Sequence, residues 1–298
     1  MDSSDHILPA VNRIDALFKE TELEDYYLSV QIGEKSFSYC ILDSKTNKYI
    51  GIGELRMPVT KGPGEQEIRL PFDAFFSRVM EALPILRKRF KSCKVIWEGR
   101  KSTLVPEPLF EEREQQKILA FNVQLESQEK IFNDRMAELH IVNVYAVPEK
   151  VNSLLTRTFA VDQLPHLISV LISSIYRNYK RQLIRPKIFM NIREFYFDLV
   201  VMDQFKLYYA NMFDFHTAED LIYFTIFVME QLGFSQEQAE IVLMGKITRN
   251  TPLFNLLFKY IRKIDFARRS TDHEYGSVFH EIPPHAYFPL LNLNQCGL

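Results

Sequence analysis

Hydrophobic and polar residues alternate along three consecutive stretches near the start of the chain. The pattern predicts strands at Tyr27–Ile32, Phe37–Leu42 and Tyr49–Leu55. A tight turn at Gly33 joins the first two strands. Apolar residues then recur at helical spacing from Phe72, and Pro84 is expected to end or kink this helix, because proline cannot continue the helical hydrogen bonds. Another strand is predicted at Val95–Gly99.

The same layout returns in the second half of the chain. Strands are predicted at Ile188–Ile192, Phe195–Met202 and Lys206–Phe213. A helix follows with Thr217 as its N-cap and ends before Gly233, and a short apolar strand closes on Gly245. A last helix begins with Thr251 as its cap and Pro252 at its first position. The repeated order predicts an α/β chain of two related domains with mixed sheets flanked by helices.

This layout divides the chain into four segments. Residues 1–23 are an N-terminal segment, residues 24–184 a first domain with an inserted helix and hairpin, and residues 185–270 a second domain. Residues 271–298 are a C-terminal tail that is expected to pack back as an added strand or anchor. The link between the domains is placed in residues 177–186, a polar, basic stretch that ends in proline.

Composition changes this picture little. The 298 residues are 47% apolar and 25% charged, which suits compact domains, and the net charge of −2 gives no general attraction to nucleic acid or anionic membranes. Cys40, Cys93 and Cys296 form neither a metal-ligand pair nor a disulfide framework, so we expect free thiols and a cytoplasmic location. No apolar run has the length of a membrane span.

Three turns carry the candidate chemistry. They are the runs Gln31–Glu34, Asn191–Glu194 and Gly245–Arg249, each of which follows a predicted apolar strand. Together with the repeated layout, they resemble the actin-like ATPase superfamily, in which two RNase H-like domains face each other and ATP lies in the cleft. The stretches FDFHTAEDLIYFTIFVMEQL and AYFPLLNLNQC are similar to a bacterial family of uncharacterised proteins with this fold.

The resemblance implies a phosphate turn with an aspartate and a glycine in each domain. Here the two aspartates are replaced by Gln31 and Asn191, and the glycine of the second turn is replaced by Arg193. Amides cannot supply the negative charge that positions Mg²⁺, so we expect no catalytic residue, no metal site and no cofactor, with ATP and Mg²⁺ disfavoured. The two amides are instead expected to bond neighbouring backbone at the strand ends. The implied vestigial nucleotide cleft consists of Gln31, Gly33, Glu34, Asn191, Arg193, Gly245, Lys246 and Thr248.

Three functions remain open. The leading interpretation is a non-catalytic binding or scaffold protein with an unidentified protein partner. The alternative is an atypical ATPase or kinase in which Glu34, Asp43 or Glu54 replaces the lost carboxylates. A second alternative is RNA binding through the basic clusters Arg87–Lys91 and Arg177–Lys187, which predicts steep salt dependence. The oligomeric state is not set by any of these features.

Overall fold

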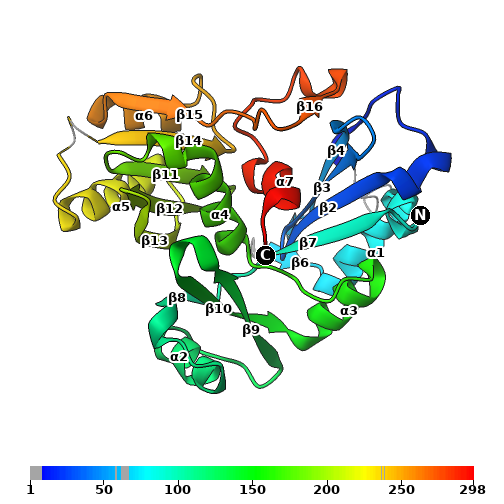
Figure 1. Ribbon diagram of the computed structural model, residues 1–298, viewed down its shortest axis with the longest axis horizontal. Helices are drawn as coiled ribbons and strands as arrows, with labels where there is room; N and C mark the ends of the chain where they lie inside the picture. Colours follow the sequence, from blue (N-terminus) through cyan, green and yellow to red (C-terminus); the bar gives the residue numbers. More distant parts are fainter. Residues whose placement is uncertain (1–8, 58, 62–66, 236, 238) are drawn as a thin grey trace.

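The computed structural model describes residues 9–57, 59–61, 67–235, 237 and 239–298. Two mixed sheets stand apart in the upper part of Figure 1, and the C-terminal helix α7 lies between these two sheets. A third, smaller sheet lies below them. The predicted α/β architecture is therefore confirmed.

The first sheet has six strands, and its core is the predicted set of three antiparallel strands. Along the sheet the order is β1 (Pro9–Ile14), β4 (Lys48–Arg56), β3 (Ser36–Asp43), β2 (Tyr26–Gly33) and β7 (Ser92–Glu98), with β16 (Glu274–Tyr275) added beside β4. β7 runs parallel to β2, as expected for a strand that returns through a helix. Two of these strands, β1 and β16, come from the two ends of the chain.

The second sheet repeats this order. It consists of β13 (Lys206–Asp214), β12 (Tyr196–Asp203), β11 (Lys187–Ile192), β14 (Glu240–Gly245) and β15 (Lys263–Phe266). Its first four strands correspond in order and direction to β4, β3, β2 and β7 of the first sheet. The predicted repeat is thus confirmed, while β15 was not predicted.

The third sheet belongs to the segment inserted between the repeats. Its strands are β8 (Ser102–Pro106), β10 (Ile141–Pro148) and β9 (Glu129–Met136), and helix α2 (Gln115–Asn122) packs on it. The predicted hairpin is β9 and β10, whereas β8 was not predicted. A separate two-stranded sheet pairs β5 (Val59–Lys61) with β6 (Glu67–Arg69).

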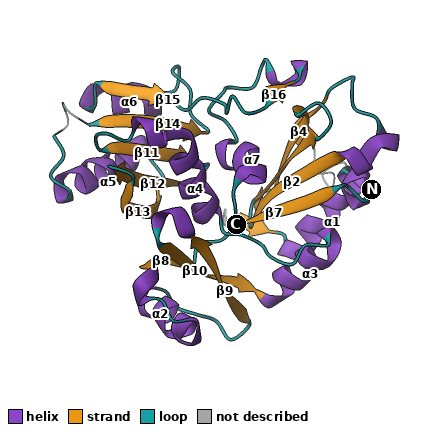
Figure 2. Ribbon diagram, viewed as in Figure 1, coloured by secondary structure: helices purple, strands orange, loops and turns teal. Residues whose placement is uncertain are grey.

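Helices cover the outer faces of both large sheets, as Figure 2 shows in purple. α1 (Phe72–Ala82) and α3 (Glu149–Phe159) share a core with the first sheet, and α5 (Ala218–Gln231) and α6 (Pro252–Tyr260) share one with the second. The predicted caps are present. Thr217 Oγ1 accepts from Asp220 N at 3.1 Å and Asp220 Oδ2 accepts from Thr217 N at 2.9 Å, a reciprocal capping box, while Thr251 caps α6. α1 ends two residues before Pro84, as predicted.

Two helices fill the space between the large sheets. α4 (Leu167–Tyr179) packs against the first sheet through Val170 and against the second through Ile172. The end of the C-terminal tail forms α7 (Phe288–Asn292), whose Leu291 carbonyl accepts from Tyr49 Oη at 2.6 Å. This end of the tail is a buried helical anchor, and the added strand of the tail is β16.

Two further predictions concern the state of the cysteines and the presence of membrane-spanning helices. All three cysteines are free thiols, as predicted. No helix in the described ranges is long and apolar enough to cross a membrane.

Candidate functional site

A cleft of about 380 Å³ lies between the two domains, a size that suits a small-molecule site. The turns after β2, β11 and β14 meet there, and residues of the C-terminal tail close one side. Of the eight residues predicted for the vestigial cleft, six line it: Gln31, Asn191, Arg193, Gly245, Lys246 and Thr248. Gly33 is buried behind Glu98, and Glu34 is exposed and does not line the cleft.

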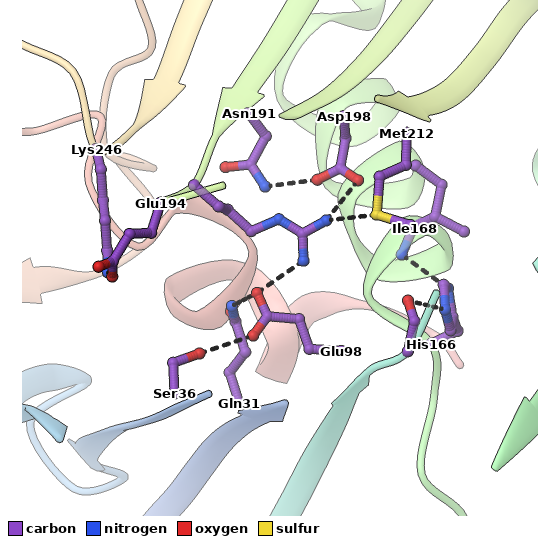
Figure 3. A network of polar contacts seen from close by, with 12 residues as sticks. Gln31, Ser36, Glu98, His166, Ile168, Asn191, Glu194, Asp198, Met212 and Lys246 are labelled. Atoms are coloured by element: carbon purple, nitrogen blue, oxygen red, sulfur yellow. Dashed lines mark hydrogen bonds and ion pairs between the residues drawn. The ribbon is translucent and has the colours of Figure 1, made fainter. Parts of the chain in front are cut away.

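At one wall of the cleft a cation is held between two carboxylates. Arg193 Nη1 donates to Glu98 Oε1 at 2.8 Å, and its Nη2 donates to Asp198 Oδ1 at 2.9 Å. Glu98 ends β7 in the first domain and Asp198 lies on β12 in the second, and Figure 3 shows the two carboxylates pointing towards the same place. We call Glu98, Arg193 and Asp198 the clamp.

The clamp is buried, and its arginine is a cation. Relative exposure is 9% for Arg193, 4% for Glu98 and 2% for Asp198. The guanidinium also lies over the ring of Tyr196, 3.8 Å from its centroid. Burial by itself lowers the pKa of Arg193, but Asp198, Tyr196 and Glu98 together raise the pKa above its usual value. Arg193 therefore remains a cation throughout the physiological pH range.

The amides of Gln31 and Asn191 position the clamp. Gln31 Nε2 donates to Glu98 Oε1 at 3.3 Å, and Asn191 Nδ2 donates to Asp198 Oδ2 at 3.0 Å. Ser36 Oγ also donates to Glu98 Oε2, at 2.9 Å (Figure 3). The expectation that these amides bond neighbouring backbone is wrong. They bond carboxylate side chains, because Glu98 and Asp198 accept hydrogen bonds in the space between the domains.

A second ion pair crosses the cleft beside the clamp. Lys246 Nζ, in the turn after β14, lies 2.6 Å from Glu54 Oε1 of β4. Glu54 also accepts from Tyr287 Oη at 2.7 Å and from Arg56 Nε at 3.0 Å. Burial raises the pKa of Glu54, but Lys246, Tyr287 and Arg56 together hold the pKa below its usual value. The first domain, the second domain and the tail thus meet at one ionised carboxylate.

Gly33 and Gly245, the two glycines of the turns, have local steric roles. A Cβ on Gly33 would lie 2.7 Å from Glu98 Oε2, so a side chain there would push the clamp carboxylate aside. Gly245 has φ +82°, and a Cβ would lie 2.1 Å from the carbonyl oxygen of Ile192. Both turns therefore depend on glycine for the close approach that builds the cleft.

Of the three carboxylates predicted to substitute for the lost aspartates in the ATPase alternative, one lines the cleft. Glu54 faces the cleft, but Glu34 does not line it. Asp43 lies at the opposite end of β3, where it accepts from Lys45 N at 2.9 Å and Thr46 Oγ1 at 2.7 Å. The sequence reasoning missed Glu98 and Asp198. A charged residue inside an otherwise apolar strand was the available signal for Asp198.

The clamp also bears on metal binding. The guanidinium occupies the space between Glu98 and Asp198 that a cation would need. Within the ranges that the structure describes, no group of three or more His, Cys, Asp or Glu side chains is arranged to hold a metal ion.

The two basic clusters are partly neutralised by other residues. In the first cluster, Lys88 pairs with Glu20. In the second cluster, Arg177 lies 3.5 Å from Asp272 and Lys187 pairs with Glu240. These contacts reduce the positive charge that either cluster offers to a phosphate backbone.

The fold is shared with proteins of known structure. A protein from Bacteroides thetaiotaomicron, described as having an actin-like ATPase fold and unknown function, matches with a TM-score of 0.75 at 20% identity, covering 94% of this chain and 100% of that one. The PilM–PilN type IV pilus biogenesis complex matches with a TM-score of 0.59 at 13% identity, covering 89% of this chain and 96% of that one. These likenesses establish the actin-like ATPase fold.

Sequence comparison supplies the family. No curated protein matches the chain. A family model described as a protein of unknown function, DUF3822, matches residues 15–264. The chain therefore belongs to the DUF3822 family.

Proposed function

We propose that this protein is a non-catalytic, protein-binding member of the actin-like fold, whose nucleotide cleft is held closed by its own side chains. The observation that carries the proposal is the clamp, in which Arg193 joins Glu98 of one domain to Asp198 of the other. The second pair, Lys246 with Glu54, supports it. Both ion pairs cross the space where the nucleotide lies in the superfamily.

Mg·ATP would have to displace these ion pairs. Its phosphates would meet the carboxylates of Glu54 and Glu98, and the cations of Arg193 and Lys246 are already paired. Breaking a buried ion pair by withdrawing one partner costs about 3–5 kcal/mol. That cost has to be subtracted from any nucleotide affinity. We expect millimolar binding at best, about 4 kcal/mol.

Two observations support a protein partner. The structural neighbour PilM is described in a complex with PilN, which supports protein binding as a use of this fold. Several aromatic side chains are also exposed on the second domain, with Tyr208 at 55%, Tyr223 at 64% and Phe227 at 45%. Exposed aromatic residues of this kind are enriched at protein interfaces.

Calorimetry with Mg·ATP and a phosphate-release assay test the proposal together. The expected result is no saturable heat below millimolar nucleotide and no release above the buffer rate. A micromolar dissociation constant that Gly245→Trp weakens would contradict it, because Gly245 lines the cleft. Turnover that disappears in Glu54→Gln or Glu98→Gln, and persists in the exposed control Glu138→Gln, would instead establish the enzyme alternative.

A further inference from the structure

Two sheet edges approach each other beside the clamp, and its Arg193 and Asp198 also line the cavity between them. β8 is an edge strand of the third sheet and β13 is an edge strand of the second, and they lie near each other in Figure 1. Arg100, two residues before β8, pairs with Asp214 at the end of β13. Residues of both strands line a cavity of about 510 Å³, whose wall also includes Ile168 at the start of α4.

The hydrogen-bond alternation of an antiparallel pair identifies which backbone groups of β13 point outward. Phe215 N–H donates to the Phe195 carbonyl at 2.9 Å, so this residue pair and every second pair along the ladder are bonded. Ala210 and Met212 fall in the intervening positions, and their N–H and C=O groups point away from β12. Met212 N–H accordingly donates to its neighbour's side-chain oxygen, Asn211 Oδ1, at 2.9 Å.

The same reasoning applies to β8. Ala146 N–H donates to the Lys101 carbonyl at 3.0 Å, so the bonded pairs of the β8–β10 ladder involve odd-numbered residues of β8. The backbone groups of Ser102 and Leu104 therefore point away from β10. The four residues with outward groups, Ser102, Leu104, Ala210 and Met212, all line the cavity.

We propose that this cavity takes an extended segment of a partner protein, inserted as a strand between β8 and β13. An extended peptide presents N–H and C=O groups on both of its sides at strand spacing, which is what two facing edges require. The inference rests on the proposed protein-binding function and names its site and the form of the partner. At about 3.4 Å per residue, the two short edges engage roughly four residues of the partner.

The cavity also sets the chemistry of that segment. Leu104, Val123 and Ile168 are apolar wall residues, whereas Arg100, Asn122 and His166 are polar. A segment that fits this wall carries apolar side chains towards the first group and hydrogen-bonding side chains towards the second. The Asn211 side chain accepts from the outward N–H of Met212, which protects this edge from unspecific pairing. The incoming strand replaces that side chain with a carbonyl oxygen.

The test uses the full-length chain and a phage library of random dodecapeptides. Enriched peptides are synthesised, and their dissociation constants are measured by fluorescence anisotropy. We expect Leu104→Pro and Ala210→Pro each to weaken binding at least tenfold. Proline at these positions removes an outward N–H and leaves the ladder hydrogen bonds in place.

The matched control is Arg135→Pro on β9. Glu149 N–H donates to the Gln128 carbonyl at 2.8 Å, so Arg135 lies at an outward position of the opposite edge of the same sheet. Its variant should bind within twofold of the wild type. Unchanged circular dichroism and melting temperature confirm that each variant folds.

Backbone N-methylation of the peptide tests the inserted strand without altering the protein. A strand bonded on both sides uses successive N–H groups towards opposite edges, so methylation at each of four consecutive residues should weaken binding at least tenfold. If methylation weakened binding only at every second residue, the peptide would pair with one edge alone, and the proposal would be overturned. Absence of any enriched peptide, or affinities that neither groove proline changes, would also overturn it.

Two further outcomes separate the inference from the proposed function. Peptides that bind outside the groove would overturn the inference and leave a protein-binding role in place, whereas Mg·ATP turnover would overturn the proposed function alone. A dimer in sedimentation that both groove prolines dissociate would overturn the inference by making a second copy of the chain the occupant.

Discussion

Arg193 of the second domain donates to Glu98 of the first at 2.8 Å, and both side chains are almost completely buried. The bond joins residues that are 95 positions apart in the sequence. Because the arginine comes from one domain and the glutamate from the end of a strand in the other, this contact links the stability of the protein to the closure of its cleft.

Arg193→Met should destabilise the protein by about 3–5 kcal/mol, because it leaves Glu98 and Asp198 as buried carboxylates without a cation. Urea unfolding at pH 7 measures the loss. The double variant Arg193→Met, Glu98→Gln should recover at least about 1 kcal/mol, since it removes one of the uncompensated charges.

The exposed residue Arg157 supplies the control for this prediction. Arg157→Met should change stability by no more than about 0.5 kcal/mol. A loss below about 1 kcal/mol in Arg193→Met would mean that the clamp adds little to stability, and that its carboxylates take up protons or water when the arginine is removed.

The Lys246–Glu54 pair predicts a pH dependence. The pKa of Glu54 is held below its usual 4.5 in the folded state, so the folded protein binds this proton less readily than the unfolded chain. The resulting stabilisation is fully present above pH 4.5 and is lost as the pH falls through the lower, folded-state pKa. The stability difference between the wild type and Glu54→Gln should therefore be largest near pH 7 and shrink below pH 4.5.

Urea unfolding at pH 7, 5, 4 and 3 checks this course. Glu138→Gln, at an exposed position, should show a small difference that does not follow it. A Glu54→Gln difference that stays constant down to pH 3 would contradict the assignment of an ionised, paired Glu54.

Much of the fold could be predicted because its signals are local. The alternation in β2 and β3, the Thr217 capping box and the proline that follows α1 each depend on residues close together in sequence. β1 and β15 escaped prediction because their pairing is decided by a partner edge elsewhere in the chain. β15 reads Lys-Ile-Asp-Phe, which has too few apolar residues to be recognised alone.

The site was predictable only in outline. The repeated layout places Gln31, Asn191 and Lys246 at turns that meet in the cleft, and the structure brings them together. The partners Glu98 and Asp198 could not be assigned, because their role appears when the two domains face each other. A carboxylate at the end of a strand has many uses, and the choice among them is made by the residue that lies opposite in space.

The thiols give an independent prediction. Burial raises the pKa of Cys93 to about 12 and also raises the pKa of Cys40 and Cys296, so the thiolate is scarce at pH 8. The native protein should react slowly with Ellman's reagent, and the denatured protein should show three thiols without reductant. Cys93→Ser should reduce that number to two. Fewer than three in the denatured wild type would reveal a disulfide and contradict the structure.

Gly245 and Gly233 form a matched pair that isolates a steric contact. Both have positive φ, +82° for Gly245 and +71° for Gly233, so alanine at either position carries the left-handed backbone cost of about 1–2 kcal/mol. A Cβ on Gly233 meets nothing within 4 Å, whereas a Cβ on Gly245 would lie 2.1 Å from the Ile192 carbonyl oxygen. That oxygen accepts from Lys246 N at 2.7 Å and cannot move without breaking the turn.

Gly245→Ala should therefore cost at least about 2 kcal/mol more than Gly233→Ala in urea unfolding, because relieving an overpacked contact displaces backbone. The same displacement would shift Lys246 away from Glu54, so Gly245→Ala should also lose the pH-dependent stabilisation expected for that pair. Gly233→Ala, in an open turn after α5, should retain it. Equal losses in the two variants would mean that the turn after β14 yields easily, and that the cleft does not depend on the close approach of its glycine.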